Sequence, residues 1–290
     1  MPIYLAYYFW LLLISAVMFT LERLFPWRRE QEVLRPGFVQ DLFWMVFNIQ
    51  YVSWMLAVLA VYVVTRFNAA VFHSGMPAPE SIQLIAHWPA WAQFAGVFLV
   101  KDFLEWNIHH LLHRVPLLWR LHQLHHSIEE LDWAAAFRGH WGEIILYKVV
   151  IYLPLVVLGV ETSVIFAVIA VSLVIHEFSH ANLRWDLGPL RYIVSSPRYH
   201  AWHHDVTLHG KAGQNYGISL VFWDWIFRTA YWPRGVEGPE RYGLPASDHY
   251  PTGIWGRLWW PFLPRRRTAD DAGKLQAQPE KVADRVGTES

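Results

Sequence analysis

Ten of the sixteen histidines in this chain of 290 residues lie in four short clusters. Most steps within a cluster are three or four residues, the spacing that makes side chains neighbours on one face of a helix. Neutral imidazole binds iron, copper, nickel and zinc, and one such ion takes only about four to six ligands. We therefore expect a centre of two metal ions whose ligands are His109, His113, His122, His125, His126, His176, His180, His200, His203 and His204.

The other six histidines do not share this grouping. We expect His73 and His87 to be structural and His249 to lie on the surface. His140 stands near Arg138 and Glu143. Two alternatives stay open for it: a role in the substrate pocket or in contact with a metal ligand, and a structural role. A metal-bound imidazole generally donates its second N–H to a carboxylate, a carbonyl or water. The carboxylates near the clusters are Asp102, Asp132, Glu143, Asp205 and Asp224.

The composition indicates a membrane protein. Hydrophobic residues make up 54% of the chain, with 18 Trp, 13 Tyr and 17 Phe, and the formal net charge is zero. Apolar runs of about 20 residues span the hydrocarbon core of a bilayer, and Trp and Tyr gather at its interfaces. Such runs cover residues 3–21, 42–65, 89–100 continuing into the first histidine pair, and a hairpin of 143–160 and 162–175 broken at 159–161. The first run lacks the basic start and the small-residue cleavage site of a signal peptide.

We therefore predict an all-α integral membrane bundle of about four to five embedded helices with a histidine-rich di-metal cap. Segment 22–41 carries four arginines, whereas loop 66–88 carries only Arg66, so the positive-inside rule places the first on the cytoplasmic side. Following the spans from there puts the histidine clusters, Arg265, Arg266 and Arg267 on that side. The expected divisions are membrane helices at 1–88, a catalytic domain at 89–235, a membrane-proximal segment at 236–264 and a disordered polar tail at 265–290.

Composition also excludes several functions. A nucleic-acid partner normally needs a basic patch, and none stands out in the part expected to fold. Without cysteine the chain forms no disulfide and ligates no iron–sulfur cluster, so any electrons must come from another protein.

One motif competes with the di-metal interpretation. Residues 176–180 spell H-E-x-x-H, in which a zinc protease uses the two histidines as ligands and the glutamate as general base. An intramembrane zinc metalloprotease is therefore an alternative, although it accounts for only His176 and His180 among the ten. A haem-carrying electron-transfer protein and a metal-storage protein are further alternatives, but adjacent histidines such as His125 and His126 fit haem ligation poorly.

The motifs KDFLEWNIHHLLH, LHQLHHS, AFRGHWGE, HEFSHANL, SPRYHAWHHD, QNYG and WDWIFRT resemble the fatty acid hydroxylase and sterol desaturase superfamily over about residues 95–232. The resemblance implies a membrane-bound diiron oxygenase that hydroxylates or desaturates a lipid with dioxygen. Its ligand pattern falls on the same ten histidines. It implies two iron ions, which zinc can replace in isolated protein, and an external electron donor of cytochrome or ferredoxin type with a reductase. Substrate or second-shell roles are expected for His140, Asn182, Asp102 and Asp224.

Two positions depart from the pattern common in that superfamily. His110 stands where an arginine commonly follows the first histidine, and Glu105 stands where a tyrosine commonly precedes the tryptophan. The substrate is therefore open among sterols, fatty acyl chains, ether lipids and hopanoids, as is the choice between hydroxylation, desaturation and ether cleavage. We expect the lipid tail to enter sideways from the bilayer, along aromatic residues with Trp133, Phe137, Trp141, Phe178 and Trp202 as candidates.

Overall fold

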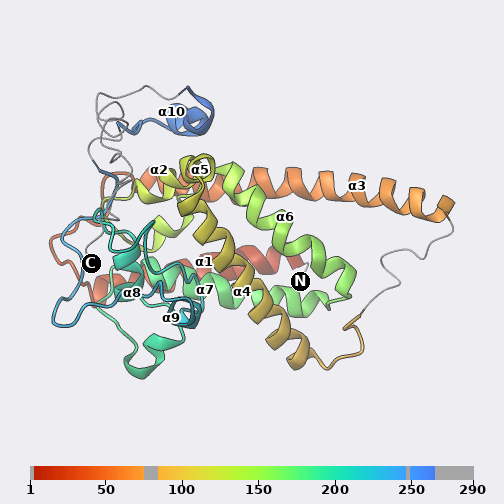
Figure 1. Cartoon of the computed structure of the whole chain (residues 1–290), viewed down its shortest axis with the longest axis horizontal. Helices are drawn as coiled ribbons and strands as arrows, with labels where there is room; N and C mark the ends of the chain where they lie inside the picture. Colours follow the sequence, from red (N-terminus) through yellow and green to blue (C-terminus); the bar gives the residue numbers. More distant parts are fainter. Residues whose placement is uncertain (1–2, 75–83, 246–248, 265–290) are drawn as a thin grey trace, which may run out of the picture.

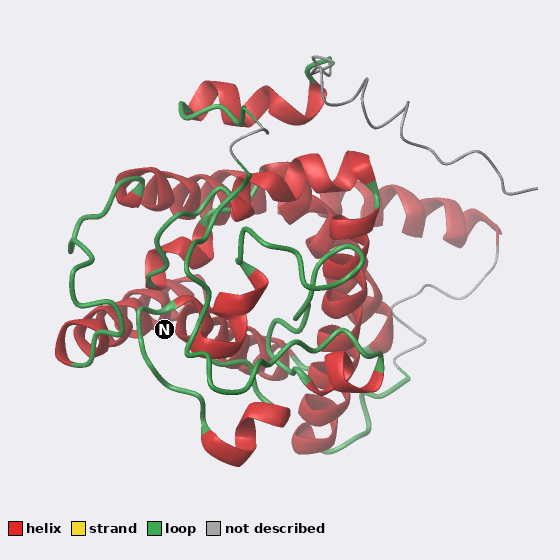
Figure 2. Cartoon of the chain, turned by 60° about the vertical axis from the view of Figure 1, so that its left-hand side comes forward, coloured by secondary structure: helices red, strands yellow, loops and turns green. Residues whose placement is uncertain are grey.

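The protein is built from helices and the loops that join them. The structure, a computed structural model, describes residues 3–74, 84–245 and 249–264, and these residues contain no β-strand (Figures 1 and 2). The long helices are α1 (Ile3–Leu24), α3 (Ser53–Ser74), α4 (Ala90–Arg114), α6 (Trp141–Leu158) and α7 (Thr162–His180). Shorter helices are α2 (Phe38–Val46), α5 (Pro116–His126), α8 (Pro197–His203), α9 (Phe222–Ile226) and α10 (Ile254–Trp259). The expectation of an all-α fold is confirmed for the described residues.

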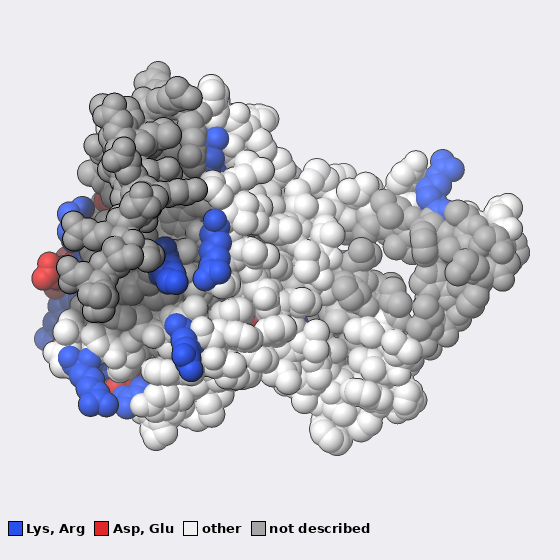
Figure 3. Space-filling view, in the orientation of Figure 1, with Lys and Arg blue, Asp and Glu red and all other residues white. Residues whose placement is uncertain are grey.

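Three helical segments of the described chain are long and apolar enough to cross a bilayer, namely Tyr7–Leu24, Phe38–Leu59 and Thr162–His180. Their outward faces are apolar, with Leu12, Trp54 and Val58 each more than half exposed. In the view of Figure 3, charged atoms gather at the end of the molecule that carries α8 and α9, while the rest of that face is almost free of them. Additional spans formed by α4 and α6 stay a prediction, as does the orientation in the membrane.

The expected span at 42–65 lies within a continuous helix that is not regular throughout. Between α2 and α3 the segment Phe47–Val52 is a π-helix, in which each turn holds an extra residue. Such turns often occur at functional sites because they rotate the side chains that follow. Here the π-helix places Asn48 so that its side-chain amide donates to the Gly139 carbonyl at 2.8 Å.

The expected hairpin is present, and its break has a local cause. Helix α6 ends at Leu158, where Gly159 has φ of 71° and ψ of 38°, a left-handed conformation that glycine adopts without strain. Helix α7 begins three residues later at Thr162. Its apolar side chains Val164 and Val168 pack with Leu155 of α6 and Val97 of α4. The C-terminal ends of α4 and α7 therefore come to the same end of the bundle, where α5 and α8 also lie (Figure 1).

Three short 3₁₀ turns also occur in the described residues. The 3₁₀ turns are η3 (Trp133–Phe137), η4 (Gly188–Tyr192) and η6 (Trp260–Phe262). Asp132 accepts a hydrogen bond from the Ala135 amide at 2.9 Å and so caps η3. Phe38 and Trp133 pack together with Ile14 and Met18 of α1, which fixes η3 between α1, α2 and α7. The C-terminal arginines Arg265, Arg266 and Arg267 and the expected polar tail lie outside the described residues.

Candidate metal centre

Nine of the ten clustered histidines converge into two compact groups. In each group one ligand atom from every residue lies within 4.8 Å of those of the other members. We call them the first histidine group, made of His109, His113, His122, His126 and His203, and the second histidine group, made of His125, His180, His200 and His204. Each group offers four or five imidazoles to a common centre, enough for one ion each, and the expected pair of ions stays a prediction.

Helices from distant parts of the sequence supply the two groups. Helix α4 contributes to the first group and α7 to the second, while α5 and α8 contribute to both. The adjacent residues His125 and His126 at the end of α5 belong to different groups. Helix α8 is short, and Ser196 fixes its start by accepting a hydrogen bond from the Tyr199 amide, with Pro197 at the first helical position.

Outer hydrogen bonds set the orientation of the imidazole rings. For four rings the Nδ1 atom lies 2.7 to 3.1 Å from a backbone carbonyl oxygen, which can only accept. The Nδ1 atom of these rings therefore carries the proton, and the Nε2 atom keeps a free lone pair. These pairs are His109 with Tyr216, His125 with Arg138, His180 with His176, and His203 with Gln214.

One carboxylate takes the same role. The Nδ1 atom of His122 lies 3.0 Å from Oε1 of Glu143, and both residues are buried. A carboxylate that orients a ligating imidazole also raises its basicity. The expectation that a nearby carboxylate orients a clustered histidine therefore has a concrete candidate in Glu143. Two other carboxylates have different partners, because Asp132 pairs with Arg35 and Asp205 pairs with His209.

The inner nitrogens face one another in a way that calls for a cation. His125 Nε2 and His180 Nε2 are 3.3 Å apart, although both rings carry their proton on Nδ1. Two lone pairs at this distance repel unless a proton or a metal ion lies between them. A proton is unfavourable, because burial and the neighbouring imidazole of His180 lower the pKa of His125 well below its usual value. The donor set therefore fits a metal ion.

The second group repeats this pattern on α8. His200 Nε2 lies 3.0 Å from His180 Nε2 and 3.1 Å from His204 Nε2. Burial lowers the pKa of both His200 and His204 well below the usual value, so the two imidazoles are neutral near pH 7. Their Nδ1 atoms are buried and have no hydrogen-bond partner among the described residues, which is uncommon for buried polar groups. Neutral, tightly packed imidazoles are the form in which histidine binds a metal.

His176 lies next to the second histidine group but not within it. Its ring centroid is 4.7 Å from that of His180, and its Nε2 donates to the Ala136 carbonyl at 2.8 Å. Its main-chain carbonyl also accepts from His180 Nδ1. Glu177, the next residue, accepts a hydrogen bond from Ser15 of α1 at 3.0 Å. The two histidines of the H-E-x-x-H motif therefore occupy different positions relative to the groups, and its glutamate pairs with α1.

Asp224 and Asp102 hold the loop that follows α8. The carboxylate of Asp224 accepts from the main-chain amides of Tyr216 and Gly217 and from Trp106 Nε1 of α4, at 2.7 to 3.0 Å. The same carboxylate accepts from two hydroxyl groups, at 2.6 and 3.1 Å. Asp224 thereby positions Tyr216, whose carbonyl orients His109.

Asp102, which lies one turn before Trp106 on α4, binds the same loop. It accepts from the amides of Ser219 and Leu220 and from Trp223 Nε1, at 2.9 to 3.2 Å. Both carboxylates therefore contact the loop rather than one of the clustered imidazoles.

Asn182 and His140 form hydrogen bonds with the backbone of distant segments, and their expected roles at the site stay predictions. Asn182 exchanges side-chain hydrogen bonds with the Arg28 backbone, at 2.8 and 3.0 Å, and so joins the chain after α1 to the chain after α7. His140 caps α6 by accepting from the Gly142 amide, and its Nε2 donates to the Leu258 carbonyl at 3.0 Å. Of the histidines expected to lie elsewhere, His73, His87 and His249 are exposed.

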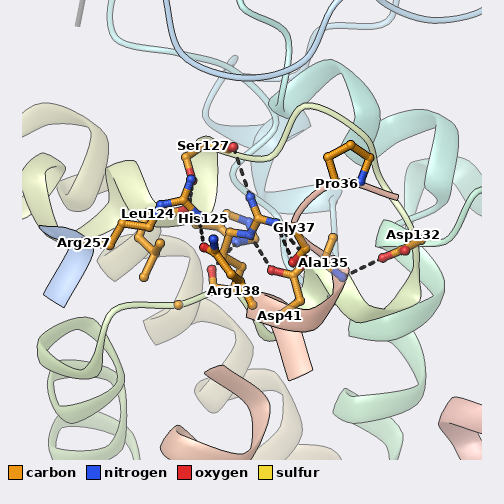
Figure 4. Close-up of polar contacts among 12 residues, drawn as sticks. Pro36, Gly37, Asp41, Leu124, His125, Ser127, Asp132, Ala135, Arg138 and Arg257 are labelled. Atoms are coloured by element: carbon orange, nitrogen blue, oxygen red, sulfur yellow. Dashed lines mark hydrogen bonds and ion pairs between the residues drawn. The ribbon is translucent and has the colours of Figure 1, made fainter. Parts of the chain in front are cut away.

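A buried ion network braces the second histidine group (Figure 4). The Arg138 guanidinium pairs with Asp41, which also binds Arg35 at 2.7 Å, and Arg35 reaches Asp132 at 2.5 Å. Two arginines and two aspartates balance in charge, which makes their burial tolerable. Arg138 also donates to the carbonyls of Gly37 and Ser127, while its own carbonyl accepts from His125. The ion network therefore fixes the backbone atom that orients a member of the second group.

A cavity of about 610 Å³ opens from both histidine groups into the helical bundle. Its lining includes His109 and His122 of the first group and His125 and His200 of the second. From there it extends along α4, α6 and α7 as far as Lys101, Ile151 and Ile169. Along their helices they lie eight, eight and seven residues from His109, Glu143 and His176, which line the cavity at the site, and this corresponds to about 10 to 12 Å of helix. A cavity of this volume falls within the range of small-ligand sites.

The expectation for the aromatic lining was largely wrong. Of the five candidates only Phe137 lines the cavity. Trp133 and Phe178 instead pack in the core with α1 and α2, Trp141 stacks on Phe262, and Trp202 packs against Tyr231. Aromatic residues next to the motifs in sequence fill gaps between helices, and sequence adjacency does not say which side of a helix faces the cavity.

Several polar residues of the cavity were missed by sequence reasoning. They are Tyr7 and Tyr8 of α1, Asn48 of the π-helix, and Lys101 and Glu105 of α4. A signal existed for the last two, since Lys101 and Glu105 precede His109 by eight and four residues and so share its helix face. No such signal existed for Asn48, because its direction depends on the π-helix.

Comparisons with known proteins agree with this geometry. Residues 94–229 match the family model for fatty acid hydroxylase, a segment that contains all ten clustered histidines. An ornithine lipid hydroxylase of Rhizobium tropici is 32% identical over 181 residues, which are 62% of this chain and 53% of that protein. The human alkylglycerol monooxygenase is 30% identical over 49% of this chain and 30% of its own length. Methylsterol monooxygenase 1-3 of Arabidopsis thaliana is 25% identical over 54% of this chain and 52% of its own.

The chain thus spans about half or less of the length of these relatives. No solved structure matches it. The relatives are named as lipid hydroxylases and monooxygenases, and the family model covers the helices that deliver both histidine groups. The match and the geometry together show that residues 94–229 are similar to the fatty acid hydroxylase family, whose relatives found here are named as lipid hydroxylases and monooxygenases.

Proposed function

We propose that this protein is a multi-pass membrane oxygenase that hydroxylates a lipid with dioxygen, using two iron ions and electrons from a cytochrome or ferredoxin with its reductase. The observation that carries the proposal is the pair of histidine groups at the end of a cavity between apolar helices. The named activities of the relatives support lipid hydroxylation. The arginine distribution supports a site on the cytoplasmic side of the membrane.

The proposed ligands are the five histidines of the first group and the four of the second, with His176 beside them as a tenth candidate. Iron bound there would supply the redox chemistry that an unactivated C–H bond requires and that zinc lacks. The protein contributes the outer contacts of the rings, in which four carbonyls and Glu143 hold each Nε2 toward the centre.

The remaining contribution of the chain is to position the substrate. The cavity walls from α4, α6 and α7 hold an extended lipid against the histidine groups and keep bulk water from the reacting carbon. Apolar side chains such as Ile144, Ile151 and Leu173 supply most of this lining. A tail that enters between the helices from the bilayer needs no passage through water. Hydroxylation, desaturation and ether cleavage differ in which carbon or hydrogen is placed nearest the centre.

The direct test is to express the full chain in cells and compare their lipids, by mass spectrometry, with those of cells that carry His125→Ala. We expect a lipid that gains one oxygen atom under aerobic conditions only with the unchanged protein, and purified protein with about two irons per chain. Loss of two hydrogens in place of gain of oxygen would indicate a desaturase. An unchanged lipid profile in iron-loaded, aerobic cells would contradict the proposal.

A second variant separates the oxygenase from a zinc protease. Glu177→Gln removes the general base that the protease alternative requires, while leaving the nine grouped histidines intact. We expect this variant to keep the oxidised lipid product. If Glu177→Gln loses all activity while His122→Ala keeps it, the result would favour the protease.

A further inference from the structure

Two charged residues of α4 form a buried ion pair inside the cavity. Lys101 Nζ lies 2.6 Å from Glu105 Oε2 and 2.7 Å from Ser172 Oγ of α7. Lys101 is only 4% exposed. Lys101, Glu105 and Ser172 all line the cavity that opens from the histidine groups. The pair is therefore buried in the protein but in contact with the space available to a ligand.

The ion pair lies at a defined distance from the proposed chemistry. Lys101, Glu105 and His109 follow one another at steps of four residues and share one face of α4. At the usual rise per residue, Lys101 lies about 12 Å and Glu105 about 6 Å along the helix axis from His109. A ligand group held by the pair would therefore set how much of an extended chain reaches the histidine groups.

A buried ion pair is generally a weak source of fold stability. Replacing a buried ion pair by apolar residues of similar volume is often neutral or stabilising, because burial removes both charges from water. Ionisable residues among apolar helices are uncommon for the same reason, and they usually serve a substrate or ion. Glu105 also stands where the resemblance to the superfamily leads one to expect a tyrosine. The pair therefore distinguishes this chain at a position that faces the cavity.

The contacts of the pair leave hydrogen-bonding capacity for a ligand. An ammonium group has three protons, and the described residues supply two close acceptors, Glu105 and Ser172. The second carboxylate oxygen of Glu105 is an additional acceptor. The charges of Lys101 and Glu105 cancel, so the pair offers a carboxylate or phosphate no net attraction to offset the cost of removing its charge from water. A neutral group that both donates and accepts a hydrogen bond, such as a hydroxyl, matches both partners.

We propose that Lys101 and Glu105 bind a neutral hydroxyl-type group of the lipid substrate and thereby select which part of its chain reaches the histidine groups. This inference rests on the proposed function, because it assumes that the occupant of the cavity is the lipid. Ser172 positions the Lys101 ammonium from α7, and apolar side chains such as Ile151 accommodate the hydrocarbon. The substrate class that follows is a neutral lipid alcohol rather than a free fatty acid.

The experiment measures equilibrium binding of three radiolabelled probes of equal chain length, 1-hexadecanol, hexadecanoate and hexadecane, to the purified metal-loaded chain without oxygen. We expect the unchanged protein to bind hexadecanol about tenfold or more tighter than either other probe, as one hydrogen bond to a charged group allows. Lys101→Met with Glu105→Leu should abolish the advantage of hexadecanol over hexadecane. The matched control, Arg184→Met with Glu237→Leu, removes an exposed ion pair and should retain it.

A single variant gives a signature that a purely structural role would not produce. Glu105→Gln keeps the shape of the side chain but leaves the Lys101 charge without its counter-charge. We expect the preference to move from hexadecanol to hexadecanoate by about tenfold. Three outcomes would each overturn the inference. The unchanged protein could show no preference for hexadecanol, it could bind hexadecanoate more tightly than hexadecanol, or the preference could persist after both residues are replaced. The first two outcomes need no variant, so a double variant that fails to fold does not protect the proposal.

The binding assay and the oxygenase assay fail separately. Binding is measured without oxygen, so a protein that selects hexadecanol but oxidises no lipid keeps this inference and refutes the proposed function. A protein that oxidises cellular lipids but binds the three probes equally keeps the proposed function and refutes the role of Lys101 and Glu105.

Discussion

Adding one methyl group at Gly37 should disable the ion network that braces the second histidine group. Gly37 has φ of 88°, and a Cβ built there would clash with Arg138 Nη2. The guanidinium would have to move, and it would lose its hydrogen bonds to the Gly37 carbonyl at 3.3 Å and to Asp41 Oδ2 at 3.0 Å. Its backbone carbonyl, which orients His125, would then be less firmly held.

The size of the effect follows from two contributions. A left-handed backbone costs a residue other than glycine about 1 kcal/mol. Loss of the contacts between the Arg138 guanidinium and its buried acceptors adds about 3 kcal/mol, since hydrogen bonds to charged groups contribute about 1.5 to 3 kcal/mol each. Gly37→Ala should therefore cost about 4 kcal/mol, which corresponds to a fall in melting temperature of roughly 8 to 16 °C for a chain of this size class.

A matched control isolates the clash from the backbone conformation. Gly235 also has a positive φ, 75°, but nothing lies within 4 Å of a Cβ built there. Gly235→Ala should therefore cost only the backbone contribution of about 1 kcal/mol. Thermal unfolding of both variants in detergent, with iron content measured in parallel, gives the comparison. Equal melting temperatures for the two variants, or full iron content in Gly37→Ala, would refute the proposed coupling between Gly37, Arg138 and His125.

Three other perturbations have defined outcomes. Glu143→Gln should weaken metal binding by about tenfold to a hundredfold, because it removes the carboxylate that orients His122, and competition with a chelator measures the loss. Asp224→Asn should destabilise the protein by about 3 kcal/mol, because the new amide N–H donors would face the backbone N–H groups that now donate to the carboxylate. Thermal unfolding would measure this loss of stability. Burial lowers the pKa of His203 to about 3, so the metal-free protein should lose stability as the pH falls below the usual histidine value. Below that value the folded state binds fewer protons than the unfolded chain, so the free energy of unfolding falls by about 1.4 kcal/mol per pH unit for this residue. A free energy of unfolding that does not change between about pH 7 and pH 5 would contradict the prediction.

The sequence was informative wherever the relevant contacts are local. The spacing of His109 and His113 and the apolar run before them predicted one helix that carries both residues, and α4 is that helix. Gly159 between two apolar segments predicted the hairpin, because glycine readily adopts the conformation that ends α6. The hydropathy of the first two runs predicted helices, and both lie among the candidate membrane spans.

Contacts between distant residues were not predictable in this way. Asp41 and Arg138 are 97 positions apart, and nothing in their neighbourhoods indicates that they pair. The π-helix that turns Asn48 toward Gly139 has no reliable sequence signature. The assignment of His126 to one group and His125 to the other depends on where α4, α7 and α8 end in space. Local spacing selects candidate ligands, whereas packing decides which of them share a centre.

The position of His125 and His126 at the end of α5 has a consequence for how this centre can vary. Successive Cα atoms are separated by a fixed distance of about 3.8 Å, whatever surrounds them. One of these residues belongs to each group, so a single peptide unit fixes the distance between the backbone positions that supply the two groups. Changes in the surrounding helices therefore leave this separation unchanged, whereas insertion of one residue between the two histidines would alter it directly.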